Sequence, residues 1–409
     1  MRLFYNITVS FYYLLILIAS LFNEKAQLWL RGRKNILKKL KAALENDTSK
    51  RVWFHCSSLG EFEQGRPLIE EFRKQYPTYK ILLTFFSPSG YEIRKNYAGA
   101  DYIFYLPADT PANARRFINI VKPQFVFFVK YEYWFNYMNQ LRKHEIPLVI
   151  VSAVFRPGQY FFKWYGAWAL NKLKSIQHFY VQHSDVALLL KKHGIENVTI
   201  SGDTRFDRVL AVTQDDTAYP KIEAFCKNQK ALIVGSSWPA DENLILSCLE
   251  DLQNYKIIFV PHDLNHVESL LKNAGKNAVL YSDLNEEEDK QIVIVNAIGH
   301  LSKLYRYASI AYVGGGFGQG IHNILEPAAY GIPVIFGPNY SKFIEANELL
   351  IAGGAFCIQN ENDFKNVISL LKNDDLYTKA ANVSKSYVQN GAGATQKVLT
   401  DVKHFFTEK

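Results

Sequence analysis

Several motifs that would assign this chain to a large enzyme class are missing from its sequence. It contains no G-x-x-x-x-G-K-[ST] loop, which argues against a P-loop NTPase. No D-x-D occurs, so the usual carboxylate site for a metal-bound diphosphate donor is absent. The four cysteines are far apart and form no C-x-x-C pair, which argues against a zinc site or a disulfide framework and is compatible with a reducing compartment. No recognised nucleic-acid-binding motif accompanies the net charge of +8.

The chain is long and apolar enough to build more than one hydrophobic core. It has 409 residues, of which 48% are hydrophobic and 21% charged, so two domains of about 200 residues are expected. Beyond the first 50 residues, short apolar runs alternate with helix-like stretches such as Pro67–Gln75. One series of runs extends from Val52–Cys56 to Phe179–Gln182, and a second from Ala231–Gly235 to Pro333–Phe336. This alternation predicts parallel sheets with right-handed crossovers.

The N-terminus combines an apolar segment with a basic one. Ile7–Phe22 is mostly apolar and aromatic. The basic residues that follow it are Lys25, Arg31, Arg33, Lys34, Lys38, Lys39 and Lys41. A basic flank beside an apolar segment is drawn to anionic lipid and tends to remain in the cytoplasm. Because the apolar segment is shorter than the roughly 20 residues that span a bilayer comfortably, and its charges follow it, we predict a monotopic or single-pass anchor. The alternatives are a cleaved signal peptide and an ordinary buried helix.

The predicted fold class is α/β, with two doubly wound Rossmann-like domains facing a cleft (the architecture called GT-B) and an N-terminal membrane-associating helix. We predict a membrane anchor helix at residues 1–24, a basic juxtamembrane segment at 25–50, an acceptor-binding domain at 51–207, a linker at 208–228 and a donor-binding domain at 229–409. The last helix is a candidate to pack back on the first domain. Ligands of such sheets bind at the carboxyl ends of the strands.

Residues 314–338 form the most informative stretch of the chain. Ile310–Val313 predicts a strand, a glycine cluster follows at 314–320, and a helix start is expected at His322–Glu326. Glycines let a backbone approach a ligand closely, and a helix N-terminus suits a phosphate. Glu326 is placed to accept hydrogen bonds from ribose hydroxyls. The glycines do not satisfy G-x-G-x-x-G, which weakens a dinucleotide interpretation. Without a metal, N–H groups and basic side chains must neutralise the leaving phosphate, which is easier for a donor with one phosphate.

Several motifs, taken in order, resemble one family. They are WFHCSSLGE (Trp53–Glu61), a run from Phe179 through HSD (His183–Asp185) to GDTRFD (Gly202–Asp207), GSSWPADE (Gly235–Glu242), VPH (Val260–His262) and HNILEPAAYGIPVIFGP (His322–Pro338). They are similar to motifs of 3-deoxy-D-manno-octulosonic acid (Kdo) transferases, and the resemblance covers nearly the whole chain. It implies an inverting glycosyltransferase that moves Kdo from CMP-Kdo to a lipid A precursor in lipopolysaccharide core biosynthesis. The resemblance also implies a location on the cytoplasmic face of a Gram-negative inner membrane. From the basic flank and the missing motifs, we further predict contact with anionic lipids, and no metal, cofactor or nucleic-acid partner.

The resemblance also implies roles for individual residues. Glu61 matches the general base, which would deprotonate an acceptor hydroxyl. From the residues alone, Glu61 is equally an acid that complements a helix start, and Glu63 is close enough to be the base instead. The CMP-binding positions of the family fall on Pro261, His262, Ile298, Gly299, His300, Asn323, Ile324, Leu325 and Glu326. Asn323 and Glu326 also approximate a capping box.

Some positions depart from the family's pattern or match it weakly. Many members have arginine at the position of His262, so phosphate neutralisation would depend on pH here. Many members have an acid where this chain has Lys130. The lysine side chain could pair with Glu132, bind the sugar carboxylate or face solvent. Arg156 is a candidate anion contact. Two alternatives remain: another nucleotide-sugar enzyme, such as a UDP-sugar transferase or a 2-epimerase, and a non-catalytic membrane-bound nucleotide-sugar binding protein.

Overall fold

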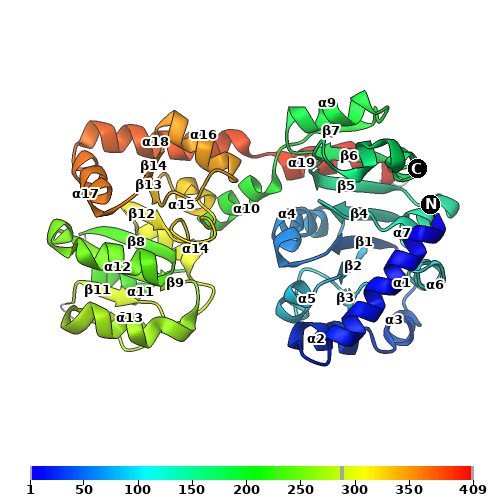
Figure 1. The fold of residues 1–409 in the computed structure, drawn as a ribbon, viewed down its shortest axis with the longest axis horizontal. Helices are drawn as coiled ribbons and strands as arrows, with labels where there is room; N and C mark the ends of the chain where they lie inside the picture. The colour runs from blue at the N-terminus through cyan, green and yellow to red at the C-terminus, as the bar shows by residue number, and fades with distance from the viewer. Residues whose placement is uncertain (1, 228, 286–289, 407–409) are drawn as a thin grey trace. The chain divides into compact units, whose positions relative to one another are not determined.

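The computed structural model describes residues 2–227, 229–285 and 290–406, and the chain divides into two compact units (Figure 1). Unit 1 comprises the described residues up to 208 together with those from 393 onward, and unit 2 comprises those from 209 to 392. The predicted linker, 208–228, contains the end of helix α10 (Thr204–Thr213) and the whole of α11 (Pro220–Cys226). Residue 228 and the terminal residues 1 and 407–409 lie outside the described part of the chain.

Unit 1 is built on a parallel sheet with the strand order β3-β2-β1-β4-β5-β6-β7. Its strands are β1 (Arg51–Cys56), β2 (Lys80–Phe85), β3 (Tyr102–Tyr105), β4 (Phe125–Val129), β5 (Leu148–Ala153), β6 (His178–Val181) and β7 (Val198–Ile200). Its helices besides α10 are α1 (Arg2–Ala19), α2 (Glu24–Arg33), α3 (Ile36–Leu44), α4 (Leu59–Gln75), α5 (Pro88–Arg94), α6 (Pro111–Val121), α7 (Phe135–Lys143), α8 (Ala167–Leu173), α9 (Ser184–Lys192) and α19 (Ala394–Val402). The strand order reverses between β1 and β4.

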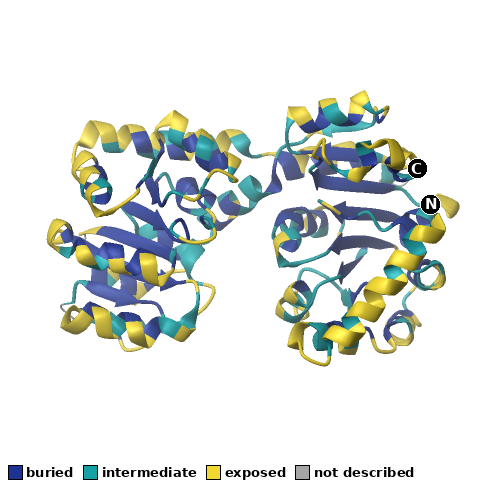
Figure 2. Cartoon of the chain, in the orientation of Figure 1, coloured by how far each residue is buried: buried dark blue, intermediate teal, exposed yellow. Residues whose placement is uncertain are grey.

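The two faces of the unit 1 sheet are covered by different helices, because successive strand residues point to opposite faces. Trp53 packs in a core with residues of α3, α6 and α7. Its neighbours Val52 and Phe54 pack in a second core with residues of α4 and α19. The last helix, α19, is therefore part of unit 1 and contacts α4. The central strands β1, β4 and β5 are mostly apolar and buried along their whole length (Figure 2), which is typical of a sheet covered on both sides.

Unit 2 repeats this plan with the strand order β10-β11-β9-β8-β12-β13-β14, again with parallel pairs. Its strands are β8 (Lys230–Ser237), β9 (Tyr255–Pro261), β10 (Ala278–Leu280), β11 (Ile292–Ile294), β12 (Ile310–Val313), β13 (Val334–Phe336) and β14 (Ala355–Cys357). Its helices besides α11 are α12 (Pro239–Ser247), α13 (Val267–Ala274), α14 (Leu301–Leu304), α15 (Leu325–Ala329), α16 (Ile344–Ala352), α17 (Glu361–Leu370) and α18 (Asp374–Gly391). The order reverses between β8 and β12.

The predicted α/β class with two doubly wound parallel sheets is confirmed. Three of the described strands, β7, β10 and β14, were not predicted. Each is three residues long and lies at a sheet edge, so its apolar run is short. The predicted helix Pro67–Gln75 was too short. Helix α4 begins at Leu59, and Pro67 lies inside it, where the ring removes one backbone hydrogen bond without ending the helix.

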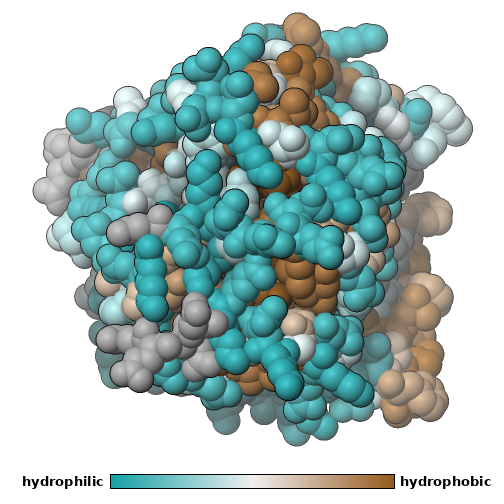
Figure 3. Space-filling model, turned by 90° about the vertical axis from the view of Figure 1, so that its left-hand side faces the viewer, coloured by the Kyte–Doolittle hydropathy of each residue, from teal (hydrophilic) through white to brown (hydrophobic). Residues whose placement is uncertain are grey.

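The N-terminal helix α1 is the one helix of the described residues that is long and apolar enough to cross a membrane. None of its side chains is buried, and Leu3, Phe4, Ile7, Leu14 and Leu17 are among those largely exposed. By contrast, Figure 3, which looks onto unit 2 from the left-hand side of Figure 1, shows a mostly hydrophilic surface. The exposed apolar surface of α1 is what a membrane-associating helix presents.

One member of the predicted basic flank is not at the surface. The side chains of Lys25, Arg31, Lys34, Lys38, Lys39 and Lys41 are exposed, but Arg33 is buried. Its guanidinium lies 3.7 Å from the centroid of the Trp29 ring and close to the rings of Phe86 and Tyr105. Arginine tolerates this position because its weakly hydrated, planar group stacks on aromatic faces. Arg33 is therefore part of the packing of unit 1, unlike the exposed members of the basic flank.

Candidate active site

The sequence motifs lie where each sheet reverses its strand order. In unit 1, the HCSSLGE motif begins in the last two residues of β1 and the segment around Glu132 follows β4, and β1 and β4 are neighbours. In unit 2, the SSWPADE motif begins in the last two residues of β8 and the glycine cluster follows β12, and these strands are also neighbours. The carboxyl edge at such a reversal is the usual ligand site of a doubly wound sheet. Each unit therefore has one candidate site at this position.

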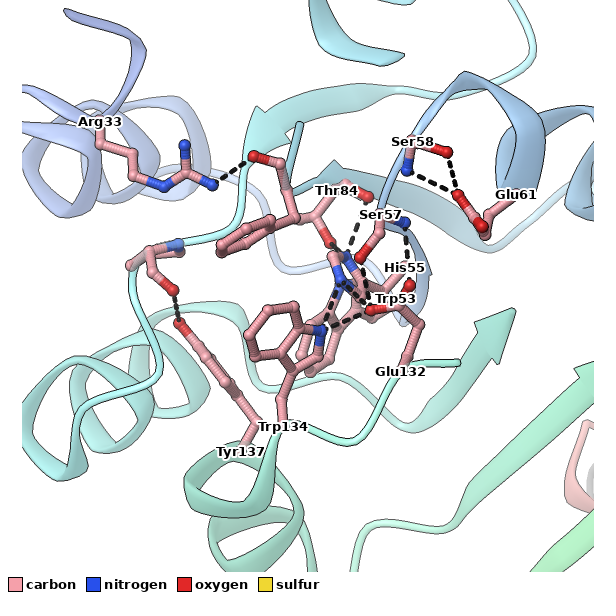
Figure 4. A network of polar contacts seen from close by, with 12 residues as sticks. Arg33, Trp53, His55, Ser57, Ser58, Glu61, Thr84, Glu132, Trp134 and Tyr137 are labelled. Atoms are coloured by element: carbon pink, nitrogen blue, oxygen red, sulfur yellow. Dashed lines mark hydrogen bonds and ion pairs between the residues drawn. The ribbon is translucent and has the colours of Figure 1, made fainter. Parts of the chain in front are cut away.

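Two consecutive serines at the start of α4 hold two different carboxylates (Figure 4). The backbone N–H of Ser57 donates to Glu132 Oε1 at 3.2 Å, and its hydroxyl donates to Oε2 at 2.7 Å. The backbone N–H of Ser58 donates to Glu61 Oε2 at 3.1 Å, and its hydroxyl donates to the same oxygen. The partial positive charge of a helix N-terminus favours both carboxylates here. The structure thus brings together Glu61 and Glu132, which are far apart in sequence.

Glu61 has one carboxylate oxygen fixed and one open. Both donors of Ser58 reach Oε2, whereas Oε1 has no hydrogen bond or ion pair with any of the described residues. Glu63, the alternative base, is already engaged: Arg94 Nη2 lies 2.7 Å from its Oε1, and Arg208 Nε lies 3.8 Å from its Oε2. The helix-start role and a base role are compatible for Glu61, since the capping interaction uses only one of its oxygens. The geometry favours Glu61 over Glu63 as the group that meets a substrate.

Glu132 is the centre of a buried polar network. It is 2% exposed, and Trp134 Nε1 donates to its Oε2 at 2.6 Å. His55 Nε2 lies 3.0 Å from the same oxygen. On the other side of the ring, His55 Nδ1 lies 3.0 Å from the carbonyl oxygen of Thr84, the residue that faces His55 in the parallel register of β1 and β2. These contacts orient the carboxylate rigidly, as buried polar networks do when they are fully paired.

His55 has polar partners on both sides of its ring. Its Nδ1 lies 2.8 Å from the hydroxyl oxygen of Thr84, which can donate or accept, as well as 3.0 Å from the carbonyl oxygen. Its Nε2 lies 3.0 Å from Glu132 Oε2 and 2.9 Å from Trp134 Nε1. His55 therefore joins Thr84 of β2 to the segment that follows β4, in a site from which solvent is excluded.

Lys130 and Arg156 are the other predicted substrate contacts. The backbone of Lys130 has a left-handed conformation with φ of 71°, and its N–H donates to the Val151 carbonyl at 2.8 Å. Its ammonium lies 5.4 Å from the centroid of the Tyr131 ring, a cation–π distance. Arg156 is exposed and follows β5. A substrate contact of either residue stays a prediction.

The glycine cluster of unit 2 borders a cavity of about 580 Å³. Gly315 has φ of 91°, and a Cβ there would lie 2.5 Å from the carbonyl oxygen of Gly320, so the turn requires glycine. Asp241, at the start of α12, anchors the turn by accepting from the N–H of Gly315 at 2.9 Å and from the hydroxyl of Tyr312 at 2.8 Å. Burial raises the pKa of Asp241, although these hydrogen bonds oppose the effect. The loop is therefore pinned to a neighbouring helix.

Three aromatic rings form one wall of this cavity. His262 stacks on Trp238 and on His322, with ring centroids 4.8 Å and 4.3 Å away. Trp238 Nε1 donates to His322 Nε2 at 3.0 Å. Burial lowers the pKa of His322 to about 4, and the adjacent His262 adds to the shift. His322 is therefore neutral at pH 7, as its acceptor role toward the indole requires.

The lowered pKa of His322 predicts an acid-sensitive unit 2. The unfolded chain, with a histidine pKa of 6.5, binds more protons than the folded one between pH 6.5 and about 4. This contribution to stability is complete above pH 6.5 and is lost as the pH falls toward 4. In His322→Gln, whose amide oxygen can still accept from Trp238, we expect a smaller fall in the melting temperature of unit 2 between pH 7 and pH 5. Equal falls in the two proteins, measured by calorimetry, would contradict the assignment.

The remaining predicted CMP-binding residues surround the same sheet edge. Pro261 ends β9, and the exposed His262 follows it. Ile298, Gly299 and His300 follow β11; Ile298 is 86% exposed, and His300 Nδ1 lies 3.0 Å from the Tyr219 hydroxyl. Of the described residues that line the cavity, His262 is the one on the predicted list.

The helix start after the glycine loop has its own hydrogen bonds. Asn323 Oδ1 accepts from the N–H of Leu325 at 3.1 Å, and its Nδ2 donates to Glu326 Oε1 at 3.2 Å. Ile324 and Leu325 are buried, so only their main-chain atoms are candidates to meet a ligand. α15 begins at Leu325, inside the predicted range.

Sequence reasoning assigned no role to the residues that hold these sites together. His55, Ser57, Trp238, Asp241 and His322 all stand inside or beside motifs quoted for the resemblance. The available signal was a polar side chain at the end of an apolar strand, as at His55. Their partners are 29 to 84 residues away in sequence, and pairings of that range are not visible in a single chain.

Comparison with known proteins gives the sites a context. Kdo transferases of Haemophilus influenzae and Chlamydophila psittaci are 27% and 26% identical to this chain over 384 and 356 residues, which cover 87% and 83% of it and 87% and 80% of those proteins. Residues 31–208 match the family described as 3-deoxy-D-manno-octulosonic-acid transferase (kdotransferase). Residues 31–208 thus contain a Kdo transferase domain, and the similarity to Kdo transferases extends over most of the chain. These homologues indicate that the protein is a glycosyltransferase.

A bifunctional glycosyltransferase/methyltransferase of Fusobacterium nucleatum is 29% identical to this chain over 342 residues. The match covers 79% of this chain and 53% of the Fusobacterium protein. Among solved structures, UDP-GlcNAc 2-epimerase of Neisseria meningitidis superposes with a TM-score of 0.61 at 15% identity, over 87% of this chain and all of that one. MurG of Acinetobacter baumannii gives a TM-score of 0.54 at 14% identity, over 87% of this chain and 99% of that one. At this identity, the two structures support the fold alone.

Proposed function

We propose that the protein transfers Kdo from CMP-Kdo to a lipid A precursor with inversion at the anomeric carbon. The observation that carries this proposal is Glu61 at the start of α4, with one oxygen held by Ser58 and the other open, in a chain that contains a Kdo transferase domain. A carboxylate held in this way is already oriented before it accepts a proton, so no side-chain freedom has to be lost in the reaction.

In the proposed reaction, Glu61 accepts the proton of an acceptor sugar hydroxyl while that oxygen attacks the anomeric carbon of Kdo. A new C–O bond forms on the face opposite to the nucleotide, and the bond between the anomeric carbon and the phosphate oxygen breaks. CMP leaves with the bonding electron pair. The buried Glu132–His55 network fixes the segment that carries Ser57 and Ser58, and therefore positions Glu61.

We propose that the nucleotide binds along the glycine loop of unit 2. The pinned turn at Gly315 keeps main-chain groups near the ligand without side chains in the way, and His262 lies on the same wall at the position proposed for the phosphate. Backbone N–H groups and His262 then neutralise the leaving phosphate without a metal. Asn323 and Glu326 are proposed to contact the cytidine and its ribose.

We propose that the protein works at the cytoplasmic face of the inner membrane, where its lipid acceptor is available. The exposed apolar side chains of α1 would enter the bilayer, and the exposed lysines of α2 and α3 would meet its anionic surface.

A nucleotide titration in the presence of EDTA tests the donor assignment. We expect the purified protein to bind CMP more tightly than UDP by about tenfold or more, since one well-placed hydrogen bond to the base accounts for such a factor. Removal of divalent metal with EDTA should change neither CMP binding nor transfer. Preferential binding of UDP, or activity that returns only with added Mg²⁺, would contradict the proposal and favour a UDP-sugar enzyme.

A further inference from the structure

A cavity of about 520 Å³ lies beneath α1, in a part of unit 1 that the proposed reaction does not use. Its walls come from α1, from the junction of α2 and α3, and from the loop before α6; Glu61 and Glu132 are not among its lining residues. α1 is tied to the body of unit 1 at its first turn: the Tyr5 hydroxyl donates to Asp109 Oδ2 at 2.5 Å, and Asn136 Nδ2 donates to Asn6 Oδ1 at 2.9 Å. The cavity is therefore a fixed feature of unit 1.

The cavity has a cationic wall. Arg33 and Lys38 line it, and its described lining contains no acidic residue. Arg33 donates from Nε to the Leu106 carbonyl at 2.9 Å, from Nη1 to the Trp29 carbonyl at 3.2 Å and from Nη2 to the Phe86 carbonyl at 2.7 Å. Three of its five N–H groups are thus used, all on neutral acceptors.

No carboxylate of the described residues pairs with this buried arginine. Burial lowers the pKa of Arg33 to about 9, so the group still carries its charge at neutral pH. A buried charge without a counter-ion is costly and is commonly completed by an anion. Asn35, Thr110 and Asn113 add further polar groups to the same wall.

A second, aromatic cavity of about 350 Å³ adjoins the first. The two share Val9, Tyr13 and Ala108 in their walls. The second is lined mainly by rings, including Trp29, Phe86 and Trp134, and has little polar surface. A cationic pocket continued by an apolar one has the polarity of an amphiphile with an anionic head and a hydrocarbon chain.

We propose that an anionic membrane glycerophospholipid binds beneath α1, with its phosphodiester against Arg33 and Lys38 and one acyl chain in the aromatic cavity. The membrane would supply this lipid, because α1 forms one wall of both cavities and has the exposed apolar side chains proposed to enter the bilayer. Bound there, the lipid fastens α1 to the body of unit 1 and supplies a counter-ion to Arg33. The inference does not rest on the proposed transfer reaction, although Trp134, which lines the aromatic cavity, also donates to Glu132.

Native mass spectrometry of the full-length protein in detergent tests the site, with dioleoyl phosphatidylglycerol and dioleoyl phosphatidylcholine as probes. We expect one phosphatidylglycerol to be retained in preference to phosphatidylcholine. Lys38→Glu should weaken this retention by about tenfold or more, the worth of one charge-assisted hydrogen bond. Lys39→Glu is the matched control: it makes the same charge change at an exposed position of the same helix outside the cavity, and should leave retention within about twofold of the wild type, as a screened surface charge does.

Ser10→Phe separates the site from general membrane attraction. Ser10 lines the cavity from α1, so the added ring would fill it while making the helix more apolar. We expect retention of phosphatidylglycerol to fall, while flotation with vesicles of that lipid is maintained or rises. Equal losses in Lys38→Glu and Lys39→Glu would overturn the proposal in favour of diffuse charge attraction. Displacement of the phospholipid by a lipid A precursor, one for one, would also overturn it, because the cavity would then belong to the acceptor.

Discussion

Replacement of Glu61 by glutamine is expected to lower the rate of Kdo transfer by about 10²- to 10⁴-fold, the usual contribution of a general base, while CMP binding stays unchanged. Glutamine keeps an oxygen that accepts from the Ser58 N–H, so the start of α4 should survive the change. The loss would then report proton transfer and not folding. Steady-state rates and CMP titration of the same preparation, compared with the wild type, measure the two effects separately.

Glu63→Gln provides the matched control two residues away on the same helix. Its carboxylate pairs with Arg94 and lies near Arg208 on a partly exposed surface, where one ion pair is worth about 1 kcal/mol or less. Transfer should stay within a few-fold of the wild type. A large loss in Glu63→Gln with little change in Glu61→Gln would reverse the assignment of the base. Full activity in Glu61→Gln would exclude base catalysis by this residue.

Replacement of Glu132 by glutamine is expected to destabilise unit 1 by about 1–3 kcal/mol, the cost of leaving a buried hydrogen-bond donor without its acceptor. Glu132 accepts from two donors of Ser57 and from Trp134, and His55 Nε2 lies 3.0 Å from its Oε2. An amide nitrogen in place of one oxygen would face these donors, so at least one of them would lose its acceptor. Denaturant unfolding, followed by the fluorescence of the buried tryptophans, measures the loss.

Glu70→Gln is a suitable control for this measurement. Like Glu132, Glu70 is a carboxylate with a side-chain donor: Arg66 Nε lies 2.7 Å from its Oε1. Unlike Glu132, it has about a third of its side chain exposed. We expect its replacement to cost about 1 kcal/mol or less. A loss in Glu132→Gln as small as that in Glu70→Gln would show that the network around His55 is not a strong element of the fold.

Most strands were predictable because their apolar runs are long. β1, β4, β5 and β9 have five to seven buried residues each and lie where the sequence placed them. The missed strands β7, β10 and β14 have three residues at a sheet edge, where neighbouring backbone, rather than a run of apolar side chains, defines the strand. The start of helix α4 was also missed. The helix begins at Leu59, where Ser58 donates to Glu61, and it continues through Pro67.

The candidate sites were predictable as places but not as networks. The glycine cluster after β12 and the HCSSLGE motif after β1 identified two sheet edges from sequence and resemblance alone. The contacts within them depend on strand register and chain reversal. Thr84 meets His55 because β1 and β2 pair in a particular register, and Glu132 joins them from the end of β4. Burial of Arg33 likewise follows from the packing of α2 against aromatic residues of later segments, so its place in a run of basic residues was misleading.

The most direct test of the account is the product formed from CMP-Kdo and a tetraacylated lipid A precursor. Purified wild-type protein should convert the precursor to a species heavier by one or more Kdo units, as measured by mass spectrometry, with CMP released in equal number. The Glu61→Gln protein should yield this product only on a much longer time scale. The absence of any mass gain with the wild-type protein, under conditions in which a control Kdo transferase is active, would contradict the proposed function.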